Sequence, residues 1–329
     1  MDTCNCVCAD GVLSDWFTVG SGVRQGCRIE PDLFLGPMDH MMERTAHRGM
    51  ASVTLGNEVF TDLDFADDVA LLAEMLEVLV LAMIIMQEKA AVFGLQINWS
   101  KTKTLQVPSS MPCSTVQVAD GHVEMVDAFV YLGRVIDFSG GSRGEVLHQI
   151  GIDQSCMNLL EKESGSQASG WIIRYACTRL TNGHVLLYGC ETWSITKLQC
   201  SRIEAFDMWA LRKILRIPYT RHVTNVEVTA TIRCRPLSHL VTDGRLQLFR
   251  HIARSSPQED HHHAVAAVIR GLPPDWKRPL RRPSDTWLRA VEADLGQQNI
   301  GLASAWRKAA IRDDWWSIVD TATLQRSIL

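Results

Sequence analysis

The chain has 329 residues, of which 46% are hydrophobic and 21% are charged, so it can bury a substantial core and is not an intrinsically disordered protein. Its formal net charge is -4 at pH 7, so overall charge does not indicate a nucleic-acid-binding protein and any basic surface must be local. The longest apolar run, Val78–Met86, is far shorter than the roughly 20 residues that cross a bilayer. We therefore expect no membrane partner.

The ten cysteines do not indicate a disulfide framework, because the chain is long and its first ten residues lack the apolar stretch of a secretory signal. We expect a reduced, intracellular protein, in the cytoplasm, the nucleus or both. Cys4, Cys6 and Cys8 alternate as they would on one face of a strand. This spacing does not match common zinc sites, so a metal-free strand is favoured over a zinc site.

Short hydrophobic pieces and turn signals open the chain. Residues 10–19 indicate short β segments, and a helix is expected to begin at Pro31. Gly36 and Pro37 should kink or interrupt that helix, because proline removes a backbone donor.

Residues 51–73 have the pattern of strands. Val53–Leu55 and Val59 flank a turn at Gly56 and Asn57, and Asp62–Phe65 alternates polar and apolar residues before the apolar segment Val69–Leu72. The alternation predicts that Asp62 and Asp64 lie on one polar face of a strand.

An uninterrupted apolar segment follows from Glu74 to Phe93 and predicts a helix, with Gly94 as its C-terminal cap. We expect a further strand at Leu95–Asn98. Phe129–Ile136 is another short apolar segment, and residues 139–144 have the composition of a flexible connection. The first domain boundary is placed at this connection.

The rest of the chain is predicted to be mainly helical. Apolar residues recur at helical spacing from Ile203 to Leu215, and Thr224 with Glu227 has the pattern of a capping box. Two later helices are expected around 287–295 and 306–319, after a basic linker at 272–283.

The stretch Phe65-Ala66-Asp67-Asp68 carries the clearest chemical signal. It lies between two apolar strand pieces, and a tight turn there would present adjacent carboxylates to a hard cation such as Mg²⁺ or Mn²⁺. Polymerases use two such ions, so carboxylates from two chain segments must converge on them. An isolated Asp-Asp pair is more often a solvated turn, and only the surrounding sequence favours a metal site.

That surrounding sequence resembles the reverse transcriptases of LINE-type (non-LTR) retrotransposons, which carry a Phe/Tyr-Ala-Asp-Asp hairpin. Four further segments resemble the family in the right order, and they are 22–34 (Gly-Val-Arg-Gln-Gly-Cys, then Pro31 and Leu33-Phe34), 94–103 (Gly-Leu-Gln-Ile-Asn, then Lys-Thr-Lys), 129–133 (Phe-Val-Tyr-Leu-Gly) and 186–193 (Leu-Leu-Tyr-Gly-Cys-Glu-Thr-Trp). The segment 282–306 also looks like the C-terminal tail of these elements.

The resemblance implies a role for each motif. Asp67 and Asp68 would bind the metal ions, and Lys101 or Lys103 would approach the triphosphate and act on pyrophosphate. Contact with the nucleic acid or the nucleotide is implied for eight residues: Arg24, Gln25, Gly26, Phe65, Ala66, Tyr131, Leu132 and Gly133.

Two departures from the family pattern affect this expectation. The family's other catalytic carboxylate precedes the 22–26 segment, and none of Asp2, Asp10 and Asp15 has the required strand before it and helix after it. We expect the chain to lack this carboxylate and the fingers, and therefore to be impaired in polymerisation. At residues 28–30, Arg-Ile-Glu replaces the family's proline and small residues, so the start of the helix could be altered.

Other polar clusters have two interpretations each. The histidines 261–263 could bind a transition metal, although an exposed loop is favoured. Trp171, Trp193 and Trp209 could stack on bases, but core positions are favoured. Two basic groups could contact phosphates or form solvated faces. The first, on a predicted helix, is Arg245, Arg250, His251 and Arg254; the second, in the basic linker, is Lys277, Arg278, Arg281 and Arg282.

Together these features predict an α+β protein in three parts. Residues 1–138 would form a partial reverse transcriptase palm, a short antiparallel sheet with helices; 139–235 a helical thumb; and 236–329 a helical tail with a basic linker. The implied activity is RNA-directed DNA synthesis, with an RNA template, a DNA primer, deoxynucleoside triphosphates and an upstream retroelement segment as partners. Two alternatives are a non-catalytic nucleic-acid-binding remnant and an inactive genomic relic.

Overall fold

The computed structural model describes most of the chain, and the described residues are 3–9, 11–19, 28–46, 52–55, 58–106, 115–119, 121–163, 185–218, 220–232, 235–271, 286–296 and 298–324. Two compact units emerge from the contacts, the first comprising Met1–Val53, Val59–Asn98 and Gln117–Gly121, and the second Thr54–Glu58, Trp99–Val116 and His122–Leu329. The three-part division expected from the sequence stays a prediction.

The first unit opens with a two-stranded ribbon. β1 (Thr3–Asn5) pairs antiparallel with β4 (Phe17–Val19), and β2 (Cys8–Ala9) pairs with β3 (Val12–Leu13). The described side chains of this ribbon are exposed or half-buried. The short β segments predicted for 10–19 are therefore confirmed.

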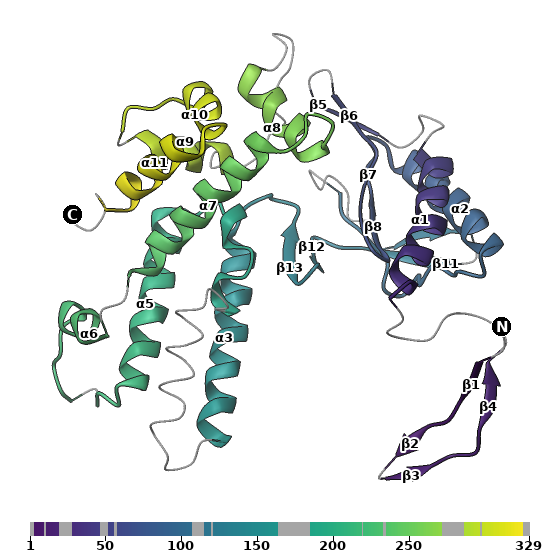
Figure 1. The fold of residues 1–329 in the computed structure, drawn as a ribbon, viewed down its shortest axis with the longest axis horizontal. Helices are drawn as coiled ribbons and strands as arrows, with labels where there is room; N and C mark the ends of the chain where they lie inside the picture. Colours follow the sequence, from purple (N-terminus) through teal and green to yellow (C-terminus); the bar gives the residue numbers. More distant parts are fainter. Residues whose placement is uncertain are drawn as a thin grey trace. The chain divides into compact units, whose positions relative to one another are not determined.

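Helix α1 (Glu30–Ala46) continues through Pro37, so the interruption expected at Gly36 and Pro37 is wrong, and the kink expected there stays a prediction. Met38 and Met41 lie on its inner face and pack against Ala90 of α2 (Leu76–Val92). Figure 1 shows the two helices side by side. We attribute the continuity to this packing, which offsets the hydrogen bond that proline cannot donate.

The C-terminus of α2 is closed by a Schellman motif, which confirms the predicted role of Gly94. Gly94 has φ +71°, and its N–H donates to the carbonyl of Ala91 at 3.1 Å. The N–H of Leu95 donates to the carbonyl of Ala90 at 3.0 Å, and the Leu95 side chain packs beside it. Residues 95–98 form no strand, because Leu95 belongs to this cap.

The strands form several small sheets rather than one. Hairpins are formed by β5 (Val53–Leu55) with β6 (Glu58–Phe60), β7 (Asp62–Phe65) with β8 (Asp68–Leu71), and β12 (Ala128–Tyr131) with β13 (Arg134–Asp137). A three-stranded sheet has the order β10 (Thr115–Val118), β11 (Gly121–Met125), β9 (Lys103–Thr104), and its β11–β9 pair is parallel. The expected mixture of helices and strands is thus confirmed, whereas the described strands do not form the one short antiparallel sheet that was expected.

In the second unit, α3 (Arg143–Glu163) and α5 (Lys197–Ile214) enclose a core with the short 3₁₀ turns η1 (Val185–Leu187) and η2 (Cys190–Thr192). Trp193 is 1% exposed in this core, as predicted, whereas Trp209 is 37% exposed beneath the ammonium of Lys213. The core position predicted for Trp209 is therefore wrong, and Trp171 lies outside the described residues.

Helix α6 (Asn225–Ile232) begins with the predicted capping box. The Thr224 N–H donates to the Glu227 carboxylate at 2.8 Å, and the Glu227 N–H donates to the Thr224 hydroxyl at 3.3 Å. The reciprocal bonds satisfy two backbone donors that the first helical turn leaves without intrahelical partners.

The last helices surround Phe249 of α7 (Leu237–Arg254), and they are α8 (Asp260–Arg270), α9 (Trp287–Gly296), α10 (Leu302–Ala309) and α11 (Arg312–Leu324). The helix expected at 306–319 is divided between α10 and α11. The loop favoured for 261–263 is wrong, because these histidines form the first turn of α8. Within the described residues, no helix combines the length and hydropathy needed to span a membrane.

Arg245 neither contacts phosphate nor belongs to a solvated face, so both interpretations from the sequence are wrong. The residue is 3% exposed, and its guanidinium is bound inside the protein. Arg250 lies over the ring of Trp316, 5.1 Å from its centroid. His251 and Arg254 remain on the surface, and the linker with Lys277, Arg278, Arg281 and Arg282 lies outside the described residues.

Candidate nucleic-acid and metal site

The β7–β8 hairpin holds the predicted carboxylates at its tip. Phe65 pairs with Asp68, and the two residues between them, Ala66 and Asp67, make the turn. Ala66 has φ +56°, a left-handed conformation that costs roughly 1–2 kcal/mol for a residue other than glycine. A strained residue at the tip of a tight turn is typical of functional positions.

The register of this hairpin separates its two faces. Val69, opposite Asp64, packs against the cluster formed by α1 and α2. Asp68 lies on the other face with Leu63 and Phe65, which are 48% and 65% exposed. The helices therefore support one face of the hairpin, while its tip and its other face are open to solvent.

The carboxylates of Asp67 and Asp68 offer oxygen ligands of the type that Mg²⁺ and Mn²⁺ prefer, and both side chains are exposed. Across the described part of the chain, no group of three or more His, Cys, Asp or Glu side chains converges as a metal site would require. The hairpin fits part of a two-metal site, and the described residues do not complete it.

The two predicted lysines lie in the second unit, whereas the aspartates lie in the first. Lys103 donates to Glu124 at 2.7 Å, and its side chain is 29% exposed. Lys101 is exposed in the turn before β9. A surface ion pair of this kind contributes roughly 0–1 kcal/mol, so it does not prevent Lys103 from taking another partner. The role of Lys101 or Lys103 at the triphosphate stays a prediction.

Residues 20–27, which include Arg24, Gln25 and Gly26, lie outside the described residues. The other predicted contacts, Tyr131, Leu132 and Gly133, form the tip of the β12–β13 hairpin. Leu132 and Gly133 both have positive φ, +49° and +74°, which is the geometry of a two-residue type I′ turn. Neither the sequence pattern nor the resemblance identified Tyr188 as a residue that holds this tip, where its hydroxyl donates to the carbonyl of Leu132.

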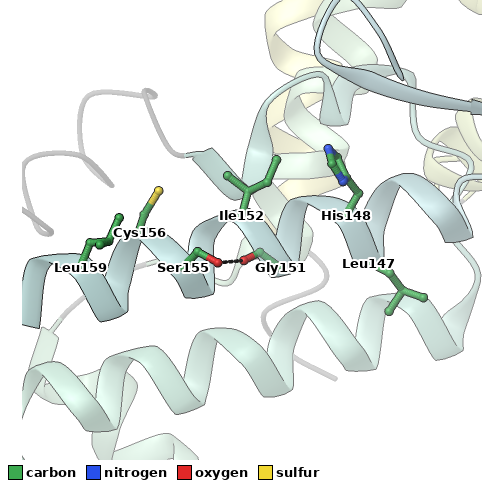
Figure 2. A pocket seen from close by; sticks show the side chains of 7 residues that line it. All are labelled: Leu147, His148, Gly151, Ile152, Ser155, Cys156 and Leu159. Carbon is green, nitrogen blue, oxygen red and sulfur yellow. Dashed lines mark hydrogen bonds between the residues drawn. The ribbon is translucent and has the colours of Figure 1, made fainter. Parts of the chain in front are cut away.

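A hollow of about 500 Å³ lies along one face of α3 (Figure 2). Its described lining consists of Leu147, His148, Gly151, Ile152, Ser155, Cys156 and Leu159. Among these described lining residues there is no carboxylate and no predicted site residue, so the hollow does not add to the metal site.

Comparison with known families gives a match over residues 5–136, to the reverse transcriptase (RNA-dependent DNA polymerase) family. The matched region contains both the Phe65–Asp68 hairpin and the tip at 131–133. Residues 5–136 are thus similar to a reverse transcriptase domain.

Over 283 residues the chain is 25% identical to an uncharacterized transposon-derived protein of Caenorhabditis elegans. The alignment covers 79% of this chain and 95% of that protein. The first comparison thus shows similarity to reverse transcriptases within residues 5–136, and the second shows similarity to a protein whose name describes it as transposon-derived.

Proposed function

We propose that this chain is the polymerase-derived part of a LINE-type retrotransposon protein, and that its activity is RNA-directed DNA synthesis. The observation that carries the proposal is the open carboxylate tip of the β7–β8 hairpin, within a region that matches the reverse transcriptase family. The resemblance of 186–193 and of the later helices to the thumb and tail of LINE-type enzymes supports the finer assignment.

Asp67 and Asp68 would hold the divalent metal ion, Mg²⁺ or Mn²⁺. When bound, such ions activate the primer 3′-hydroxyl and stabilise the charge that develops on the transferred phosphate. The chain's own contribution would be to hold two carboxylates on a supported hairpin, while Lys101 or Lys103 offers positive charge to the triphosphate.

The proposed partners are an RNA template, a DNA primer and deoxynucleoside triphosphates. Leu132 and Gly133 would lie against the primer terminus, where a tight turn lets the backbone approach closely. Arg24, Gln25, Gly26, Phe65, Ala66 and Tyr131 are the other proposed contacts. Residence in the cytoplasm or nucleus remains part of the proposal.

Because the described carboxylates make only part of a metal site, we propose that these 329 residues alone polymerise weakly or not at all. A carboxylate from a further retroelement segment, on the same or another chain, would complete the site.

Metal binding at the hairpin can be tested by Mn²⁺-induced broadening of backbone NMR signals in the 329-residue chain. We expect broadening centred on residues 65–69 that weakens at least several-fold in Asp67→Asn/Asp68→Asn. Asp64→Asn is the matched control, since Asp64 is an exposed acid on the same hairpin. Broadening that is unchanged in the double variant would contradict the assignment.

The partial metal site formed by the described residues also favours a second candidate, a nucleic-acid-binding protein without catalysis. Salt-sensitive binding of a primer–template, with no extension even when the missing carboxylate segment is supplied, would identify this candidate. An inactive relic would show neither property.

A further inference from the structure

The tip of the β12–β13 hairpin needs support from outside the hairpin. Leu132 has φ +49°, a conformation that disfavours residues other than glycine, and its side chain is 36% exposed. A two-stranded hairpin alone is only marginally stable in water. An exposed tip that must meet a ligand in one geometry therefore requires external contacts.

Tyr188, at the end of η1, supplies two of these contacts. Its hydroxyl donates to the carbonyl of Leu132 at 3.0 Å. Its ring lies against Gly133, since a Cβ placed on Gly133 would be 3.3 Å from Tyr188 Cε1. The tyrosine thus holds both central residues of the turn.

The next residue, Gly189, makes room for a second contact. A Cβ on Gly189 would overlap the guanidinium of Arg134, the first residue of β13, and Gly189 has φ +69°. In the Tyr188-Gly189 pair, the tyrosine ring therefore contacts the tip, and the absence of a side chain at Gly189 lets the Arg134 side chain pack against the backbone.

Helix α3 holds the hairpin from another side. Glu145, 3% exposed, accepts a hydrogen bond from the N–H of Val135 and lies 3.6 Å from Arg134 Nε. Gln149 donates to Glu145 at 3.2 Å and reaches the carbonyl of Gly133 at 3.5 Å. Buried polar groups with fixed partners define one position of the hairpin relative to α3.

We propose that Tyr188 is a positioning residue that fixes the Leu132-Gly133 turn in the geometry that receives the 3′ end of a primer. This role rests on the proposed function and extends it. Tyr188, which lies 56 positions from Leu132 in the sequence, would set the specificity of the site for a recessed 3′ terminus. Tyr188 is itself 55% exposed, so part of its side chain is accessible to solvent, as is the side chain of Leu132 in the turn.

The test uses the 329-residue chain and the variant Tyr188→Phe, which keeps the ring and removes the hydrogen bond. Amide hydrogen exchange is measured at residues 132–135, and affinity is compared for a recessed primer–template and a blunt duplex of equal length at one salt concentration. Thr192→Val is the matched control, since its hydroxyl donates to Gly189 within its own turn.

We expect Tyr188→Phe to increase exchange at the turn about 2- to 10-fold, the range for loss of one neutral hydrogen bond, and to reduce the preference for the recessed end by a similar factor. Affinity for the blunt duplex and the melting temperature should change little, and Thr192→Val should behave as wild type. A structural role alone would not move the ratio of the two affinities.

Unchanged exchange, or increased exchange with an unchanged preference, would overturn the role of Tyr188. A wild-type protein that shows no preference for the recessed end would instead contradict the proposed function of the hairpin. Tyr188→Phe keeps most of the packing, so loss of folding is not expected to obscure these outcomes.

Discussion

Arg245 of α7 donates to the carboxylate of Asp294 of α9 at 2.8 Å, and both side chains are 3% exposed. The same guanidinium donates to the carbonyl of Trp193 at 2.7 Å. The ion pair therefore joins the core around Trp193 to the last helices within the second unit. From the sequence, these two regions were expected to be a thumb and a separate C-terminal tail.

We predict that Arg245→Met lowers the free energy of unfolding by about 3–5 kcal/mol, because it leaves a buried carboxylate without its cation. The double variant Arg245→Met/Asp294→Leu should recover most of this loss, since it removes both charges. Urea denaturation followed by circular dichroism measures the difference.

A matched control for this prediction is Lys103→Met, which breaks the exposed pair with Glu124 and should cost no more than about 1 kcal/mol. Equal losses for Lys103→Met and Arg245→Met would show that the burial of the Arg245 pair has no energetic consequence.

Asp153 of α3 gives a pH dependence of stability. Burial, and then the nearby Asp207 carboxylate, raise the pKa of Asp153 from 3.8 to about 6. Between these pH values the folded state binds more protons than the unfolded state, so stability falls as pH rises through this window. A shift of about two units corresponds to up to ~3 kcal/mol.

We expect Asp153→Asn to remove this decline, so that the variant is more stable than wild type near pH 7, as measured by urea unfolding from pH 4 to pH 7.5. Glu204→Gln, at an exposed acid of α5, should leave the decline intact. If the free energy of unfolding rises between pH 4 and pH 6 by the same amount in the wild type and in Asp153→Asn, the role of Asp153 is contradicted.

Glycine substitutions test the cap of α2. Apart from its chain neighbours, an added Cβ meets no atom within 4 Å at either Gly94 or Gly151, so the backbone determines the effect. Gly94→Ala should destabilise the protein by about 1 kcal/mol because φ is +71° there. Gly151→Ala, inside α3, should be neutral or stabilising by up to about 1 kcal/mol. Thermal unfolding of both variants is the measurement, and the same sign for both would refute the explanation.

Cysteine labelling tests the burial of η2. Burial is the main cause that raises the pKa of Cys190 to about 12, and only a thiolate reacts rapidly with an alkylating reagent. In the native protein at pH 8, iodoacetamide should modify the exposed Cys4 and Cys8 well before Cys190, as followed by mass spectrometry. Labelling of Cys190 at the rate of Cys4 would show that the turn opens freely.

Local patterns predicted the parts of the fold that depend on local chemistry. The alternation Asp62–Phe65 predicted the first strand of the hairpin, and Gly94 marked the end of α2, because a strand period and a left-handed cap are properties of a few consecutive residues. The strand expected at 95–98 failed for a related reason. Its apolar residues fit a strand pattern, but Leu95 is used by the cap.

Contacts distant in sequence could not be predicted in this way. Asp294 lies 49 residues from Arg245, so the sequence showed a basic helix and not a buried ion pair. Trp209 is flanked by the apolar Met208 and Ala210 and Trp193 by the polar Thr192 and Ser194, yet it is Trp193 that is enclosed. At the candidate site, the carboxylate tip was recognisable from its motif, whereas the support of Leu132 by Tyr188 depends on a contact across 56 positions.

Primer extension on an RNA template with Mg²⁺ tests the role of Asp67 and Asp68 most directly. The protein is this chain joined to the upstream palm and fingers segment of an active reverse transcriptase, with Asp67→Asn/Asp68→Asn and Asp64→Asn as paired variants. We predict extension by the fusion, a loss of at least about 100-fold in the double variant and near-normal activity in Asp64→Asn. Extension that is equal in the fusion and the double variant would contradict the central claim that Asp67 and Asp68 hold the catalytic metal ions.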